Sequence, residues 1–452
     1  MMGRTGRGER PSVLRGGIFR LALLLLAGGY APAAFANDSG LPDWIAIHGQ
    51  ATFTLQATPG FASPYVGPNS LTPHQRKETI DATLYVGVRP WSGGEVWINP
   101  EVDQGFGLSN TLGVAGFPSA EAYKVGKKHP YARLQRFFFR QTIGFGGERQ
   151  DIEGTQNQFA GKTAANRLVL TVGKFGVGDI FDTNRYAHDP RGDFLNWSLV
   201  DAGNFDYAAD AWGYSTGVAI EYYRGPWTLR AGAFNLSKVP NGETLETGFG
   251  QYQLVAELEH RHAIAGREGA IRITLFHNRG MFGRFDDALA LSATSGEAPD
   301  TALVRRRQTR IGGFVNVEQA VADNVGIFAR AGLVDGQIEP YDFTDIDRTL
   351  SAGLSLDGAL WGHQHDTIGI AAVANEISDA HRHYLDAGGL GVLVGDGRLP
   401  HAGPELIGEL YYNWKPWEPI AITLDYQLVG NPGYNRDRGP AHVFGLRLHG
   451  QF

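Results

Sequence analysis

From residue 44 onward the chain is built from segments in which apolar and polar side chains alternate. Within residues 44–56, Ile45 and Phe53 belong to an apolar or small series, and the positions between them are polar; residues 78–89 and 419–429 repeat this pattern. Successive side chains of a strand point to opposite faces, so each segment has one apolar and one polar face. The pattern predicts β-strands throughout, because helical periodicity is almost absent.

About sixteen such segments follow one another, joined alternately by tight turns and long loops, which is typical of an outer-membrane barrel. They begin near residues 44, 79, 95, 134, 166, 211, 227, 252, 269, 309, 324, 348, 365, 404, 419 and 441. One connection breaks the rule, because residues 147–166 are long where a short turn is expected. We predict an all-β fold, a transmembrane antiparallel barrel with short periplasmic turns and long extracellular loops. A soluble array of β-sandwiches is the alternative.

Aromatic residues at the tight turns favour the membrane barrel. Pro-Trp pairs recur at Trp91, Trp227 and Trp417, all in turns expected on one side of the sheet. Indole rings prefer the lipid headgroup level, so such a series predicts an interfacial girdle. The last segment, residues 441–452, alternates and ends on Phe452, which is similar to the final strand of bacterial outer-membrane proteins.

The first 36 residues differ from the rest of the chain. Several arginines precede the apolar run 21–29, and Ala34-Phe35-Ala36 provides a small-x-small cleavage site. This predicts a secretory signal peptide over residues 1–36, followed by a single barrel domain over residues 37–452. There are no cysteines, which excludes disulfides and thiolate chemistry. The net charge of −7 gives no support for nucleic-acid binding.

If the apolar faces meet lipid, charged residues on the opposite faces line the lumen. Both signs occur there, so we expect a mixed polar lumen rather than an ion filter of one sign. The basic positions are Arg136, Arg140, Arg167, Arg230, Arg272, Arg310 and Arg330. The acidic positions are Asp81, Glu95, Glu101, Glu257, Glu259, Glu318, Glu409 and Asp425.

The segment GDIFDTNRYAHDPRGDFLNWS, residues 178–198, concentrates acids, bases and aromatics. It follows the fifth predicted strand and belongs to the third long loop, residues 176–205. By analogy with other barrels of this size, in which the third loop commonly folds inward, we expect it to fold into the barrel. There its charges serve either to hold the loop or to contact a solute, and the sequence leaves both roles open. The candidate constriction residues are Asp182, Arg185, His188, Asp189, Arg191, Asp193 and Trp197 on the loop, with Arg136, Arg140 and Glu101 on the wall.

Three long phrases, residues 81–126, 170–197 and 424–452, resemble the carbohydrate-selective porin family of the OprB type. The resemblance covers nearly the whole chain after the signal peptide. It implies a sixteen-stranded porin in the outer membrane of a Gram-negative bacterium, admitting glucose-like sugars and polyols by diffusion into the periplasm. Its expected partners are small sugars and outer-membrane lipids, and it is either a monomer or a homotrimer.

Enzyme interpretations find little support. Residues 213–217 match the GxSxG pattern of serine hydrolases but lie within an alternating segment instead of a strand–turn–helix elbow. The histidine pairs at 260/262 and 381/383 lack the carboxylate spacing of a metal site. We therefore expect no catalytic residues, metal or cofactor. An outer-membrane lipase or esterase, or a plugged structural barrel, is the alternative function.

Overall fold

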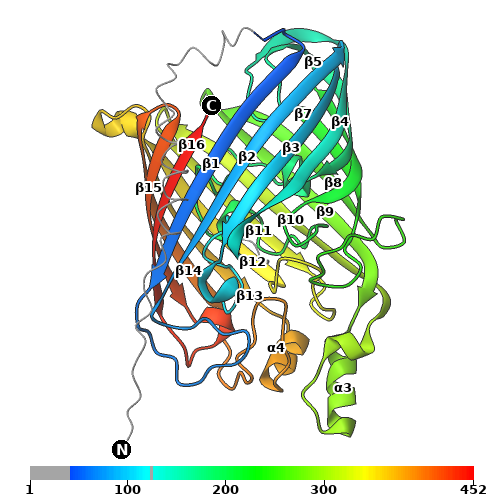
Figure 1. Ribbon diagram of the computed structural model, residues 1–452, viewed down its shortest axis with the longest axis vertical. Helices are drawn as coiled ribbons and strands as arrows, with labels where there is room; N and C mark the ends of the chain where they lie inside the picture. The colour runs from blue at the N-terminus through cyan, green and yellow to red at the C-terminus, as the bar shows by residue number, and fades with distance from the viewer. Residues whose placement is uncertain (1–40, 123–125) are drawn as a thin grey trace, which may run out of the picture.

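The computed structural model describes residues 41–122 and 126–452, and these form a closed antiparallel barrel in which each strand pairs with its neighbours in the sequence (Figure 1). The strands are β1 (Ile45–Thr58), β2 (Gln75–Trp91), β3 (Gly94–Gly105), β4 (Lys127–Ile152), β5 (Gly161–Phe175), β6 (Ser215–Arg224), β7 (Trp227–Asn235), β8 (Tyr252–Ile264), β9 (Arg267–Phe282), β10 (Arg306–Ala322), β11 (Val325–Val334), β12 (Arg348–Asp357), β13 (Thr367–Glu376), β14 (Glu405–Trp417), β15 (Ile420–Gly430) and β16 (Ala441–Gln451). The fold class expected from the alternation is confirmed. The predicted signal peptide lies outside the described residues.

The barrel closes between its first and last strands. Phe53 of β1 lies opposite Leu448 of β16, and the ladder continues to Gln50 opposite Gln451. Closure pairs the strands of the wall all the way round the barrel, which is what a strand structure needs in order to cross a membrane. No helix among the described residues is long and apolar enough to span a membrane.

The period of two places opposite chemistry on the two faces of the wall. Outward-pointing Leu84, Leu229 and Leu275 are exposed, whereas inward-pointing Asp81 and Arg230 are buried. The exposed apolar series forms the surface that meets lipid, and the polar series fills the interior. Trp91, Trp227 and Trp417 are exposed at the tight turns, as expected for an aromatic girdle.

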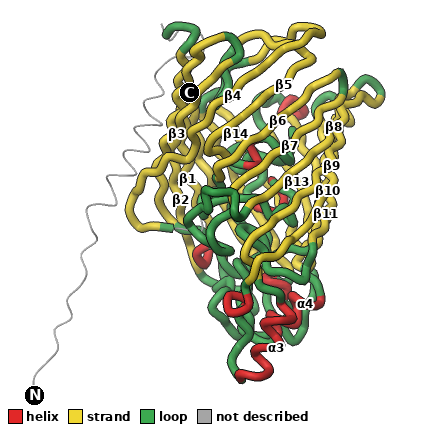
Figure 2. The backbone as a smooth tube through the Cα atoms, turned by 90° about the vertical axis from the view of Figure 1, so that its right-hand side faces the viewer, coloured by secondary structure: helices red, strands yellow, loops and turns green. Residues whose placement is uncertain are grey.

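The two ends of the barrel differ in the length of their connections. We call the end with the tight turns the short-turn end and the other the long-loop end. Loops and helices crowd the long-loop end (Figure 2). These helical segments are η2 (Leu108–Asn110), η3 (Val177–Asp179), α2 (Trp197–Val200), α3 (Phe285–Ser295), η4 (Thr301–Val304), α4 (Asp379–Asp386) and η6 (Pro432–Tyr434); η5 (Gly358–Trp361) lies at the short-turn end, between β12 and β13.

At least two loops enter the barrel from the long-loop end. The expected one, between β5 and β6, spans residues 176–214 and is called the inward loop below. Its backbone is received by the wall, because the Glu409 carboxylate accepts hydrogen bonds from the Leu195 and Asn196 amides at 2.6 and 3.0 Å. The β3–β4 loop also enters, and its Phe117 ring stacks on Trp197 of the inward loop at 5.2 Å. The long-loop half therefore has an apolar core inside the barrel.

Candidate pore constriction

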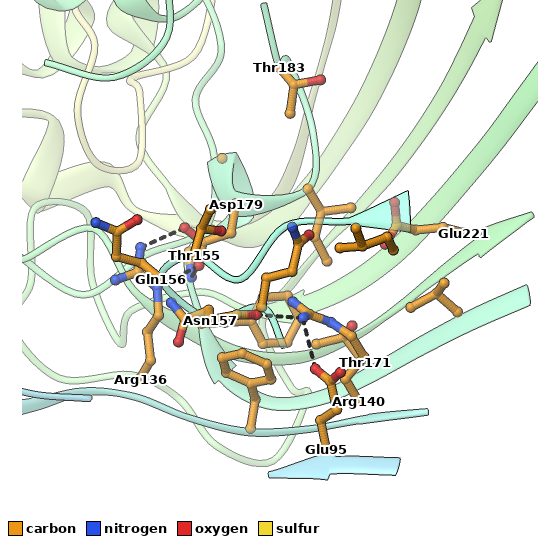
Figure 3. A pocket seen from close by; sticks show the side chains of 18 of the residues that line it. Glu95, Arg136, Arg140, Thr155, Gln156, Asn157, Thr171, Asp179, Thr183 and Glu221 are labelled. Atoms are coloured by element: carbon orange, nitrogen blue, oxygen red, sulfur yellow. Dashed lines mark hydrogen bonds and ion pairs between the residues drawn. The ribbon is translucent and has the colours of Figure 1, made fainter. Parts of the chain in front are cut away.

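A cavity of about 1120 Å³ lies between the inward loop and the short-turn end of the barrel (Figure 3). One side is formed by the inward loop, including Asp179 and Arg191, and another by the inner faces of β4 and β5. The connection between β4 and β5 contributes Thr155, Gln156 and Asn157. Charged, polar and aromatic side chains line this space together.

Arg136 of β4 joins the wall to the inward loop. Its guanidinium donates two hydrogen bonds to the Asp179 carboxylate, at 2.7 and 2.6 Å, and stands 4.8 Å from the Tyr214 ring (Figure 3). Enclosure within the barrel opposes ionisation of Asp179, but the charge and hydrogen bonds of Arg136 outweigh it and lower the pKa of that carboxyl. The forked geometry fixes the guanidinium plane beside the cavity.

Arg140 lies four residues further along β4, towards the short-turn end. It contacts the Glu95 carboxylate at 3.4 Å and donates to the Asn157 carbonyl at 2.7 Å. A quarter of its side chain is exposed to the cavity. Part of the Arg140 side chain thus remains uncovered in the cavity.

Arg191 of the inward loop extends to carboxylates of two other segments. It lies 3.4 Å from Asp81 of β2 and 3.4 Å from Glu121 of the β3–β4 loop. Burial raises the pKa of Glu121 well above its ordinary range, although the Arg191 charge opposes that rise. Arg191 therefore connects the inward loop to the β3–β4 loop and to the wall, and it also lines the cavity.

Trp197, the first residue of α2, gives the cavity an aromatic surface. Besides Phe117, its ring contacts Tyr207 at 5.5 Å and Phe343 at 5.7 Å between centroids. The indole lines the cavity, and its buried N–H has no hydrogen-bond partner among the described residues. A buried donor without a partner is costly unless a solvent or solute oxygen satisfies it.

His188 and Asp189 also line the cavity. The His188 ring stands 3.9 Å from the Asp201 carboxylate. Burial and the nearby Asp182 charge raise the pKa of Asp201 to about 7, against the opposing charges of His188 and Arg330. Asp201 is itself part of the cavity wall, so its charge changes near neutral pH at the constriction.

Four of the residues expected at the constriction lie outside the cavity wall. Asp182 is fully buried and contacts the Arg330 guanidinium at 3.0 Å. Asp193 accepts hydrogen bonds from the His188 and Asp189 amides, and Glu101 from the Thr83 hydroxyl at 2.5 Å. The fourth, the exposed Arg185, lies 3.6 Å from Glu268. Their contacts fix the loop and the wall.

Arg136, Arg140, His188, Asp189, Arg191 and Trp197 do line the cavity. Whether they contact solute stays a prediction. Sequence reasoning missed Glu121 and Phe117, which come from a loop with no unusual composition. It also gave no role to the β4–β5 connection, although the excess length of residues 147–166 marked it.

The residues of the enzyme motif are part of the wall. Ser215 begins β6, is fully buried, and donates to the Asn235 carbonyl at 2.6 Å. It thus lacks the exposed turn on which a hydrolase nucleophile stands. No group of three or more candidate metal ligands occurs within residues 41–122 and 126–452.

A closed sixteen-strand barrel with an apolar exterior, a polar interior and an inward loop defines the class of outer-membrane porins. The family model described as "Carbohydrate-selective porin, OprB family" matches residues 69–452, and the chain belongs to this family. The resemblance seen in the sequence is thus confirmed. The protein is a porin of the Gram-negative outer membrane and not an enzyme.

Solved structures agree on the fold. The high pH structure of Pseudomonas putida OprB has a TM-score of 0.68 at 16% identity, covering 94% of this chain and 97% of that one. The low pH structure of the same protein has a TM-score of 0.51 at 12% identity, covering 93% and 97%. A sequence search of curated proteins finds no match. At these identities the structural similarity supports the fold alone.

Proposed function

We propose that this porin conducts glucose-like sugars and small polyols passively into the periplasm, and that the cavity behind the inward loop is where they are selected. The observation that carries the proposal is the pairing of two chemistries on one cavity wall. Trp197 and Tyr85 offer aromatic surfaces, and Arg136, Arg140 and Arg191 offer hydrogen-bond donors. A sugar has apolar C–H faces and a rim of hydroxyls, so it matches both.

The arginines are held in a way that suits conduction. Each of the three arginines already has a carboxylate partner. A sugar hydroxyl therefore adds a hydrogen bond to a guanidinium whose charge is already balanced. Contacts that are weak and spread over several groups let a solute enter and leave.

Conductance and sugar uptake test the function. Purified protein in a planar bilayer should show stable open-channel steps, and liposomes containing it should swell in glucose. The absence of both channel steps and swelling would support a plugged barrel instead.

A matched pair of variants tests the constriction. Arg191→Ala removes a cavity-lining arginine, whereas Arg185→Ala removes an exposed arginine of the same loop that is absent from the cavity wall. We expect glucose flux to change severalfold in the first and to stay at the wild-type value in the second. Equal flux in both would remove Arg191 from solute selection.

A further inference from the structure

The connection between β4 and β5 is the long exception among the tight turns. β3 pairs with β4 as far as Gln141, and β6 pairs with β5 as far as Arg167. Beyond these positions β4 and β5 pair only with each other, up to Ile152 opposite Gly161. The result is a two-stranded hairpin that extends past the barrel rim at the short-turn end (Figure 1).

The hairpin bends at its base. The ladder shifts register on both sides of Gly146, and Gly146 and Gly147 have φ angles of 121° and 86°. These left-handed values suit glycine, and such bulges turn a strand out of its straight path. The bend directs the end of the hairpin back over the barrel mouth.

We call residues 154–160 the tip segment. The Asn157 carbonyl accepts a hydrogen bond from Arg140 at 2.7 Å, and its side-chain oxygen accepts one from Asn99 of β3 at 2.8 Å. Phe159 is buried against Trp97, 5.1 Å between ring centroids, with the Arg89 guanidinium 4.3 Å from its ring. The tip segment is therefore fixed to the inside of the wall.

The tip segment also reaches along the mouth. Gln156 donates a hydrogen bond to Gln451 of β16 at 2.9 Å, three strands around the barrel from β3. Backbone hydrogen bonds of 3.1 Å in both directions between Thr155 and Gln158 close its turn. Anchored at Asn157, Phe159 and Gln156, it is a preformed element of the mouth.

The chemistry that it presents differs from that of the wall. Residues 154–160 read GTQNQFA and carry no charge, and Thr155, Gln156, Asn157 and Gln158 all line the cavity. Hydroxyl and amide groups both donate and accept, as sugar hydroxyls do. Figure 3 shows Thr155, Gln156 and Asn157 on the same cavity as Arg136 and Asp179 of the inner constriction.

We propose that the tip segment is a second carbohydrate contact site, at the short-turn exit and in series with the constriction at the inward loop. This rests on the proposed function, because it assigns a further site for the same solutes. A sugar leaving the arginine-lined constriction passes to neutral hydrogen-bonding groups, which hold it without charge and release it at the mouth.

The test uses the full chain in planar bilayers, with glucose added to one side at a time. The double variant Thr155→Ala/Gln158→Ala removes two cavity-lining side chains of the tip segment and keeps the anchors at Gln156, Asn157 and Phe159. Its control, Asp151→Ala, alters the exposed outer part of the hairpin, where Asp151 pairs with Lys162 at 3.4 Å. Association of glucose is read from sugar-induced current fluctuations, and conductance in sugar-free salt reports lumen geometry.

We expect glucose association from the short-turn side to fall about threefold in the double variant, as loss of one net hydrogen bond predicts. Association from the long-loop side, sugar-free conductance and the Asp151→Ala control should match the wild type. Unchanged association from the short-turn side would overturn the second site. An equal fall in glucose association from both sides, together with altered salt conductance, would show that the tip segment only shapes the lumen. That result would also overturn the second site.

A second variant removes the tip segment as a whole. Replacing residues 152–161 by Asn-Gly joins the paired Asp151 and Lys162 through a two-residue hairpin turn. The short-turn-side glucose signal should disappear while signals from the long-loop side persist; persistence of both refutes the proposal. A wild-type channel that conducts salt but shows no glucose signal from either side would refute the proposed function itself, independently of any variant.

Discussion

Both halves of the barrel contain inward-pointing arginines, but the two halves use them in different ways. In the long-loop half, Arg310 and Arg330 have no exposed side-chain surface. Arg330 contacts Asp182 and donates to the Leu199, Ala187 and Val200 carbonyls at 2.7–3.1 Å. These arginines complete the hydrogen bonding of a buried, irregular loop, as backbone at membrane depth requires.

In the short-turn half, some arginines that line the cavity remain partly exposed. Arg89 and Arg140 keep 28% and 25% of their side chains exposed, and both lie beside Glu95. In both halves these arginines occupy inward-pointing positions of their strands. The position on the strand therefore does not explain the difference in side-chain exposure. What differs is whether the inward loop packs against the guanidinium, as it does at Arg310 and Arg330, which teaches that the packing of this loop decides whether such an arginine is buried or partly exposed in the cavity.

The largest effect is expected from Arg330→Met in the long-loop half. It leaves Asp182 and three loop carbonyls buried without their donor, and breaking a buried pair in this way costs about 3–5 kcal/mol. Urea unfolding in detergent micelles measures the loss. Adding Asp182→Asn should recover part of it; a single variant as stable as the wild type would contradict the loop-anchoring role.

Asp201 lies where the two halves meet, and its effect depends on pH. Because burial raises its folded-state pKa to about 7, the folded protein holds this proton more tightly than the unfolded chain. The stability contributed is present at low pH and is lost as pH rises towards and through 7. Asp201→Asn should match the wild type near pH 4 and exceed it above pH 7 by on the order of 4 kcal/mol. A constant difference between the two unfolding curves at all pH values would refute this assignment.

The smallest effect on stability is expected from Arg140→Gln in the short-turn half. Its carboxylate partner is partly exposed, and such pairs contribute about 1 kcal/mol or less. The unfolding midpoint in urea should therefore stay close to that of the wild type, in contrast to Arg330→Met. A loss as large as that of Arg330→Met would erase the proposed distinction between the two halves.

The alternation of side chains was enough to predict the barrel, because a period of two is a local property of each strand. The observed strands begin close to the expected positions, for example at Tyr252, Arg348 and Ala441. The largest differences are at β4 and β5, which begin at Lys127 and Gly161 instead of near residues 134 and 166. The excess length of residues 147–166 showed that this connection is not a tight turn, but it did not show where the extra residues fold.

The sequence alone determined the class of protein and the concentration of charge in residues 178–198. Only the tertiary structure decided which of those charges hold the loop and which face the cavity. Asp182 meets Arg330 across 148 residues of chain, and Arg191 meets Asp81 across 110. Burial and pairing of this kind depend on which distant segments pack together, and no local pattern of residues encodes that.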